Sequence, residues 1–359
     1  MQRFSYQQLL HFTTQIFLAI GCPAGDADIA AKNLLSADLR GIESHGIARL
    51  SGYVRLQEAG RLNPAPQMKV VHETPSTATL DADKALGLVS APFAMAIALQ
   101  KAELAGTGWV AVKNSNHFGI AGTHAMLALQ KDMIGIALTN ASATVAPTYS
   151  KERLLGTNPI AMAIPAGENP PFVADFATTT AANGKLEVLQ RKNENAPMGW
   201  VQNTDGLPTK NANALKQGGA MLPLGGDKDH GSHKGYMLGS MVDILSGILS
   251  GANFGPWVPP FPAYLPMPQN MPGDGIGHFF GAMRIDAFRP AADFKKDMDQ
   301  WINRFRAAAT VEGMPNVVIP GEPEVASEKE KLANGIQLLP AVVQDLLQLA
   351  DKYGVEKLR

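Results

Sequence analysis

The stretch Gly108-Trp109-Val110-Ala111-Val112-Lys113-Asn114-Ser115-Asn116-His117-Phe118-Gly119 contains the clearest combination of a buried strand and a polar loop in this chain. Residues 108–112 are an apolar run that predicts a buried strand. Residues 114–119 then place polar side chains, a histidine and a glycine at the end of that strand. Loops in such positions often carry function on a rigid scaffold, although a single histidine there is more often structural.

Strands and helices alternate on both sides of this stretch. Residues 68–72 and 77–80 alternate like strands, and residues 86–104 form a long apolar helix. Further strands are predicted at residues 134–138, 160–164, 172–176 and 279–285. Because several neighbouring strands can pair as hairpins, the pattern favours an α/β fold with a mixed sheet over a doubly wound parallel sheet.

Both ends of the chain are predicted to be helical. Ser5 followed by Gln8 is a capping-box pattern that begins a helix ending near Ile20. Helices are also predicted at residues 26–39, 291–308, 324–333 and 340–353. A chain of 359 residues favours two domains. We therefore expect a helical domain made of residues 1–65 with 291–359 and an α/β domain of residues 66–290, with a Pro-rich linker at residues 63–66.

Composition narrows the class of protein. The net charge is −1 and the pI is about 6.7, so the sequence predicts neither nucleic-acid binding nor membrane-surface binding. No stretch reaches the roughly 18 apolar residues of a membrane span. Cys22 is the only cysteine, which excludes an intramolecular disulfide and suits a reducing compartment. A cytoplasmic protein is expected.

A second chemical stretch, Glu43-Ser44-His45-Gly46-Ile47-Ala48-Arg49-Leu50, precedes the first linker. If it is helical, His45 and Arg49 are four residues apart and share one face, with Tyr53 one turn further along. The imidazole can exchange a proton and the guanidinium can hold a carboxylate, the two groups that reduction of a 2-oxo acid requires. The alternative is an ordinary surface helix with a solvated arginine.

The later part of the chain contains weaker signals. Residues 236–250 predict a helix that is apolar nearly all round and therefore buried. Lys234 near its start suits a phosphate, because a helix N-terminus also offers backbone N–H groups. His230 and His233 with Asp229 suggest an alternative metal site, although such tight spacing in a glycine-containing loop is weak support for a metal. The Gly-x-Gly-x-x-Gly fingerprint of dinucleotide-binding folds is missing from the sequence.

The ordered set of motifs resembles the type-2 malate/L-lactate dehydrogenase family, which includes ureidoglycolate dehydrogenase, diketogulonate reductase, sulfolactate dehydrogenase and piperideine-carboxylate reductase. The matching residues are Ser44-His45-Gly46 with Arg49, Asn116-His117-Phe118-Gly119, Gly156-Thr157-Asn158-Pro159, Asp175 with Thr178 and Thr179, Gly184-Lys185, Lys234-Gly235-Tyr236 and the weaker Pro320-Gly321-Glu322. The resemblance implies a non-Rossmann NAD(P)-binding domain on a mixed β-sheet and a helical domain formed from both termini. It also implies a homodimer with its active site near the subunit interface.

The resemblance further implies roles for single residues. His117 is favoured as the acid/base, with His45 as the other candidate, while Arg49 binds the substrate carboxylate and Ser44 belongs to the same catalytic group. The implied cofactor contacts are Asn140, Ser142, Thr157, Asn158, Asp175, Phe176, Ala177, Thr178 and Lys234. No metal ligand is implied.

The expected activity is hydride transfer between NAD or NADP and a small 2-hydroxy or 2-oxo acid, malate or L-lactate before others. Residues 227–232 lengthen a loop that is Gly-Gly-His-Lys-Gly in shorter relatives, and this loop bears on the cofactor choice, with NAD favoured over NADP. The alternatives are a reductase of another 2-oxo acid or a cyclic imino acid, a metal-dependent hydrolase or lyase using His230 and His233, and a non-catalytic binding protein.

Overall fold

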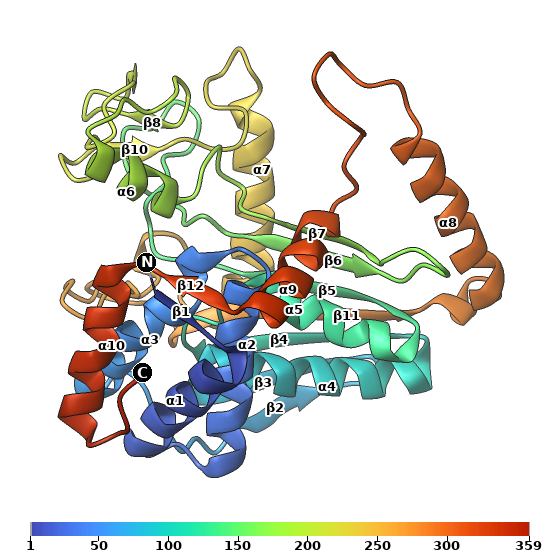
Figure 1. Ribbon diagram of the computed structural model, residues 1–359, viewed down its shortest axis with the longest axis horizontal. Helices are drawn as coiled ribbons and strands as arrows, with labels where there is room; N and C mark the ends of the chain where they lie inside the picture. Colours follow the sequence, from blue (N-terminus) through green and yellow to red (C-terminus); the bar gives the residue numbers. More distant parts are fainter. Residues whose placement is uncertain (1, 359) are drawn as a thin grey trace.

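A seven-stranded mixed sheet forms the centre of the computed structural model, which describes residues 2–358 (Figure 1). The strand order is β2-β3-β4-β11-β5-β6-β7, and only β3 and β4 run parallel among these neighbours. The strands are β2 Lys69–Glu73, β3 Thr77–Ala85, β4 Thr107–Ser115, β5 Met133–Thr139, β6 Ile160–Ile164, β7 Phe172–Phe176 and β11 Ile276–Arg284. The predicted mixed α/β class is confirmed.

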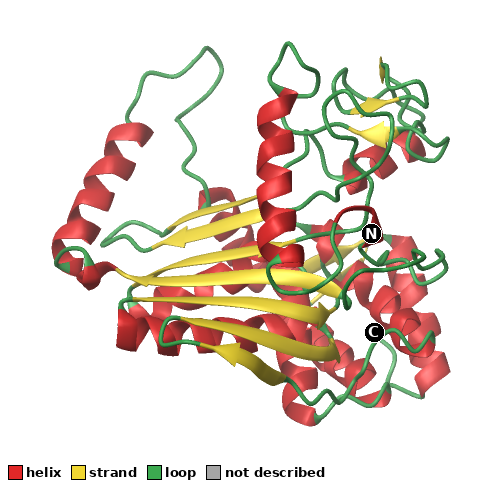
Figure 2. Ribbon diagram, turned by 180° about the vertical axis from the view of Figure 1, so that it is seen from behind, coloured by secondary structure: helices red, strands yellow, loops and turns green. Residues whose placement is uncertain are grey.

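Helices cover both faces of this sheet. Helices α4 (Gly87–Ala105) and α5 (Ala121–Ala125) pack on one face, and α7 (Ser232–Asp243) crosses the other (Figure 2). The interface with α4 and α5 is rich in alanine, which lets helix and strand backbones approach closely. A Cβ at Gly108 of β4 would lie 2.0 Å from the carbonyl oxygen of Ala98, so this position needs glycine.

Helix α4 is long and apolar enough to cross a bilayer by length and composition, contrary to the expectation that no stretch would qualify. Half of its 18-residue apolar window is buried inside the protein. Its buried face packs on β3, β4 and β11, as the core helix of a layered α/β protein does. The predicted cytoplasmic location stays a prediction.

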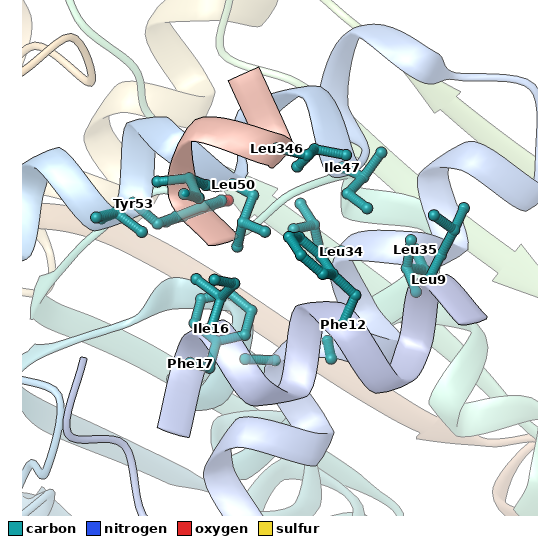
Figure 3. Packing of buried hydrophobic residues seen from close by; sticks show 14 of the residues in the cluster. Leu9, Phe12, Ile16, Phe17, Leu34, Leu35, Ile47, Leu50, Tyr53 and Leu346 are labelled. Atoms are coloured by element: carbon teal, nitrogen blue, oxygen red, sulfur yellow. The ribbon is translucent and has the colours of Figure 1, made fainter. Parts of the chain in front are cut away.

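The two ends of the chain meet in one helical cluster. Helices α1 (Tyr6–Ala19), α2 (Ala24–Leu39), α3 (Leu50–Glu58) and α10 (Pro340–Tyr353) share a buried core, shown in Figure 3. Strands β1 (Gln2–Phe4) and β12 (Ile336–Leu338) pair antiparallel beside it. The predicted capping box of α1 is present, with Ser5 and Gln8 exchanging hydrogen bonds.

The remaining C-terminal helices lie elsewhere. Helix α8 (Ala291–Arg306) stands apart from the cluster and packs beside the β6–β7 hairpin, where Trp301 meets Phe172 edge-on at 5.9 Å between ring centroids (Figure 1). Helix α9 (Glu322–Asn334) returns to α2. The meeting of the two chain ends is thus observed, while the domain boundaries at residues 65 and 290 stay a prediction.

A small lobe rises from the carboxyl end of β5. It has its own apolar core and contains α6 (Asn183–Lys192) and a short sheet of β8 (Val201–Gln202), β9 (Pro208–Thr209) and β10 (Ala220–Met221). The sequence pattern predicts no strand at β8, β9 or β10, because strands of two residues carry no periodic signal.

Two predicted helices are wrong in detail. Residues 43–49 form two short 3-10 turns, η1 (Glu43–His45) and η2 (Ile47–Arg49), separated at Gly46, and the α-helix begins only at Leu50. Helix α7 continues into a π-helix, η4 (Ile244–Ile248), and exposes an apolar side instead of burying it. Apolar composition was mistaken there for burial.

Leu346 of α10 tests whether the C-terminus belongs to this core, because it is 1% exposed within the cluster of the N-terminal helices (Figure 3). Leu346→Ala is expected to lower the free energy of unfolding by about 2–5 kcal/mol. Urea unfolding would measure it. Leu104→Ala is the matched control, because Leu104 is 89% exposed. Equal stability of the two variants would contradict the shared core.

Candidate functional site

Two histidines from distant parts of the chain stack on one another. His45 lies in η1 and His117 in the loop after β4, and their ring centroids are 5.7 Å apart with 23° between the ring planes. Both residues are partly buried. The structure thus brings together the two residues that compete for the acid/base role.

Two aromatic residues, Tyr53 and Phe261, contact the His117 ring. The Tyr53 hydroxyl lies 2.7 Å from Nδ1 of His117, and the Phe261 ring packs 4.7 Å from the imidazole. Gly52 permits this arrangement, since a Cβ there would lie 2.6 Å from Phe261. Nδ1 also accepts the N–H of Gly119 at 3.3 Å. The engagement of Nδ1 leaves Nε2 as the nitrogen available to a substrate.

The turn at residues 44–49 ties the other groups together. Ser44 Oγ lies 2.9 Å from Nδ1 of His45, and Arg49 Nε donates to the carbonyl oxygen of Ser44 at 2.6 Å. A Cβ at Gly184 would touch that of Ser44 at 3.1 Å, so the start of α6 lies against this turn. Ser44, His45 and Arg49 therefore form one constellation, although the helix predicted to align them does not exist.

Both histidines are uncharged at neutral pH. Burial and, to a smaller extent, the positive charge of Arg49 together lower the pKa of His45 to about 4. Burial also lowers the pKa of His117 well below its ordinary value, with His45 and Arg49 acting in the same direction. Burial raises the pKa of the Tyr53 hydroxyl, which stays protonated. The site therefore presents neutral imidazoles beside one positive guanidinium.

A pocket of about 310 Å³ lies beside α5, the short helix that follows the His117 loop. The carboxylate of Asp175 borders it and accepts the N–H of Gly122, five residues after His117, at 2.7 Å. Burial raises the pKa of Asp175 to about 6. The pocket is lined by Arg40, Ile42, Gly122, Val173, Ala174, Asp175, Phe176, Val318, Pro320, Gly321, Pro323 and Glu324. Ligand pockets begin at about this volume.

Three predicted cofactor residues use their side chains inside the protein. Asn140 donates to Asp243 and to the carbonyl oxygen of Asn253. Asn158 accepts the N–H of Ala141 and donates to the carbonyl oxygen of Gly239. Thr178 donates from Oγ1 to the carbonyl oxygen of Thr157. The bonds of Asn140 and Asn158 connect the segment after β5 to α7 and to Asn253, which follows η4.

The other predicted cofactor residues lie around this framework. Phe176 is largely exposed at the pocket, and Ala177 follows it. Ser142 is partly buried three residues after β5 ends, and Lys234 is exposed in the first turn of α7. All of these assignments to a cofactor stay predictions.

The alternative metal site lacks a ligand set. Nδ1 of His230 lies 2.6 Å from Asp227 Oδ1 in an exposed loop. Within residues 2–358, no group of three or more His, Cys, Asp or Glu side chains is arranged to hold a metal ion. His233 and Asp229 therefore do not complete a site with His230.

Sequence reasoning missed Phe261 as a site residue. It comes from the Pro-rich segment between η4 and β11, where no periodic pattern reveals which side chains point inward. Tyr53 had been placed one helical turn beyond Arg49, but nothing in the local sequence indicated that its hydroxyl would reach His117.

Comparison with known proteins now decides the family. The family model described as malate/L-lactate dehydrogenase matches residues 4–347. The chain belongs to this family. Malate dehydrogenase of Pyrococcus abyssi is 42% identical over 357 residues, covering 99% of this chain and 96% of the relative. L-sulfolactate dehydrogenase of Methanocaldococcus jannaschii is 37% identical, with coverage of 93% and 92%. The solved structure of malate dehydrogenase from Pyrococcus horikoshii OT3 superposes with a TM-score of 0.90 at 38% identity, covering 99% and 97%.

The protein is therefore a dehydrogenase of the 2-hydroxy acid class, and its family implies a nicotinamide cofactor. The observed residues fit such a group. Gly122 and Gly321 lack side chains at the pocket wall, where a Cβ on Gly321 would lie 3.1 Å from Val173. Apolar walls with a few polar groups suit a nucleoside.

The pKa of His45 can be measured by histidine NMR, with the His45→Gln variant used to assign its signal. The imidazole is expected to stay uncharged down to about pH 5, because burial and Arg49 lower its pKa to about 4. Arg49→Gln should raise this pKa, since it removes a positive charge. Titration of His45 near 6.5, its ordinary value, would contradict the expected effect of burial.

Proposed function

We propose that the protein transfers a hydride reversibly between NAD(P) and C2 of a small 2-hydroxy/2-oxo acid, with malate or L-lactate as the preferred pair. The supporting observation is the stacked His45–His117 pair, with Arg49 bonded to the Ser44 carbonyl oxygen in the same turn as His45 and the Asp175 pocket beside α5. The bound nicotinamide supplies or accepts the hydride. The chain itself must hold the acid, orient it and exchange one proton.

Arg49 binds the substrate carboxylate in this proposal. Its Nε is held by the carbonyl oxygen of Ser44, which leaves the terminal nitrogens of the guanidinium to form two parallel hydrogen bonds. A carboxylate fixed in this way restricts the orientation of C2. The negative charge also compensates the only positive side chain of the 44–49 turn.

His117 exchanges the proton with the C2 oxygen through Nε2. While Nδ1 accepts the N–H of Gly119, the proton of neutral His117 lies on Nε2, which cannot take another. Oxidation therefore uses the other tautomer, in which Nδ1–H donates to the Tyr53 oxygen and Nε2 accepts the hydroxyl proton. In reduction the ring must first gain a proton, which Nε2 then gives to the C2 oxygen. Tyr53 and Gly119 hold Nδ1 and thereby fix the ring orientation. His45, held by Ser44, covers the other face of the ring and stays the alternative acid/base.

The Asp175 pocket holds part of the cofactor, and NAD is preferred over NADP. Support comes from two acidic side chains at the pocket, Asp175 and Glu324, facing a single arginine, Arg40. Arg40 is already paired with Glu328 at 3.5 Å. Ribose hydroxyls suit carboxylates, whereas an additional phosphate would be repelled.

The enzyme is also proposed to be a homodimer. Met237, Met241, Ile244 and Ile248 are each at least half exposed and lie at helical spacing along α7 and η4. Such an apolar stripe is typical of a surface that a second subunit covers. The same helix is fastened to Asn158 and Asn140, which would place the cofactor framework near the interface.

A panel of acids tests the activity. NADH and NADPH oxidation would be followed with oxaloacetate, pyruvate, sulfopyruvate, a ketogulonate and a cyclic imine. Oxaloacetate or pyruvate with NADH should react best. The relative from Pseudomonas syringae pv. tomato named Delta(1)-pyrroline-2-carboxylate/Delta(1)-piperideine-2-carboxylate reductase, 32% identical over 70% of this chain, makes a cyclic imino acid the alternative. Absence of turnover with every acid would contradict the proposal.

His117→Gln should lower kcat by about 10²–10⁴-fold and leave NADH binding intact, because it removes the proton exchange. Arg49→Lys should raise the KM for the acid by about 10- to 100-fold, as one charge-assisted hydrogen bond is lost. Arg55→Lys is the control on the next helix, since Arg55 bonds Ser51 instead. Full activity of His117→Gln with an inactive His45→Gln would transfer the acid/base role to His45.

Met241→Glu tests the dimer. Met241 is 57% exposed on the apolar stripe, and a charge at this position should shift the protein to monomers in sedimentation experiments. Met198→Glu is the control, since Met198 is 55% exposed on the small lobe, away from the stripe. A wild-type monomer at micromolar concentration would contradict the dimer.

A further inference from the structure

Asp38 is a buried carboxyl group in an unfavourable place. It lies in the last turn of α2 and is 1% exposed. A carboxylate at a helix C-terminus is opposed by the helix dipole, and burial of its charge costs further free energy. Because this carboxyl group lowers the stability of the fold, its presence needs an explanation other than stability.

The contacts of Asp38 are with the turn that carries His45. Oδ2 accepts the N–H of Ile47 at 2.6 Å. The carboxyl group also lies against Gly46, where a Cβ would come within 2.2 Å of Asp38 Cγ. Asp38, nine residues before Ile47, thus acts as a capping residue for η2 from a different element, and this contact requires glycine at position 46.

The turn that Asp38 holds, residues 44–49, carries side chains that the proposed reaction uses. Ser44 and His45 precede Gly46, and Arg49 follows Ile47 and returns to the Ser44 carbonyl oxygen. Building on the proposed function, we propose that Asp38 is a positioning residue for the reaction, whose carboxylate holds residues 44–47 so that His45 and Arg49 face His117. It acts through this turn and forms no side-chain hydrogen bond with His45, Arg49 or His117.

Charged groups from two other elements face Asp38. Lys331 of α9 donates to the main-chain oxygen of Asp38 at 2.8 Å and pairs with Glu43 of η1 at 3.1 Å. Burial raises the pKa of Asp38 to about 7, against the Ile47 hydrogen bond and Lys331, while Glu43 adds to the rise. The hydrogen bond to Ile47 is charge-assisted only in the ionised form. The turn is therefore held most firmly above about pH 7.

Asp38→Asn keeps the shape and one acceptor but removes the charge. In the oxidation direction, kcat/KM of the wild type should fall as the pH drops through about 7, which gives the pH profile an acidic limb. His45 cannot cause this limb, because its pKa is about 4. The variant should lack this limb and show kcat lowered by about tenfold at pH 8, with NADH binding unchanged by fluorescence. Asp26→Asn, in the first turn of the same helix, should retain the limb.

Stability separates positioning from a purely structural role. The pKa of Asp38 in the folded state lies above its ordinary value of 3.8, so the wild type loses stability as the pH rises from about 4 to about 7. Asparagine does not ionise, so Asp38→Asn should gain in Tm relative to the wild type across this window. At pH 8 it should be at least as stable as the wild type, yet slower.

A variant with wild-type kcat and the wild-type limb would overturn the proposal, as would a Tm loss at every pH that parallels the loss of activity. If Asp38→Asn does not fold, Gly46→Ala decides, because its Cβ displaces the carboxylate and should lower kcat in the same way. Absence of the limb in the wild type overturns the inference as well. Wild-type protein inactive with every acid would instead refute the proposed function, and the Tm comparison would still test Asp38.

Discussion

His278 joins the ends of the two strands that carry different halves of the site. It lies on β11, between β4 and β5, with Nε2 2.8 Å from Ser115 Oγ and Nδ1 2.7 Å from Thr139 Oγ1. Its ring also stacks on Phe118 at 4.8 Å. Burial lowers its pKa to about 3, so it remains neutral, with one nitrogen donating and the other accepting. The relative position of the His117 loop and the segment after Thr139 depends on this ring.

The position of β11 also shows where sequence reasoning stops. Strands β6 and β7 and helix α10 have the predicted bounds, because periodicity and flanking turn residues are local signals. His278 and Thr139 are 139 residues apart, and no local pattern indicates that β11 inserts between β4 and β5. Bringing together residues so far apart in sequence costs conformational entropy, which packing of the core offsets. Strand β11 contributes the buried Phe280 and Ala282 to that core.

The sequence singled out His45, Arg49 and His117, which the structure brings together, but it did not indicate their geometry. Helical spacing had been expected to align His45 with Arg49. Instead, the helical turns are interrupted at Gly46, where the Asp38 carboxyl group occupies the space that a side chain would need. The constellation survives because a different interaction, Arg49 with the Ser44 carbonyl oxygen, closes the turn. Phe261 was out of reach of any local rule, since only the folded Pro-rich segment brings it onto His117.

The charge balance of the site links substrate binding to proton uptake. Arg49 is one cause of the lowered pKa of both His45 and His117. In the proposed reaction, a bound carboxylate neutralises Arg49 and so removes that cause, which raises the pKa of both rings. The oxo acid and the hydroxy acid both carry this carboxylate, so either one increases the proton affinity of His117 as it binds. Arg49 thus links substrate binding to the proton that His117 exchanges, in both directions of the proposed reaction.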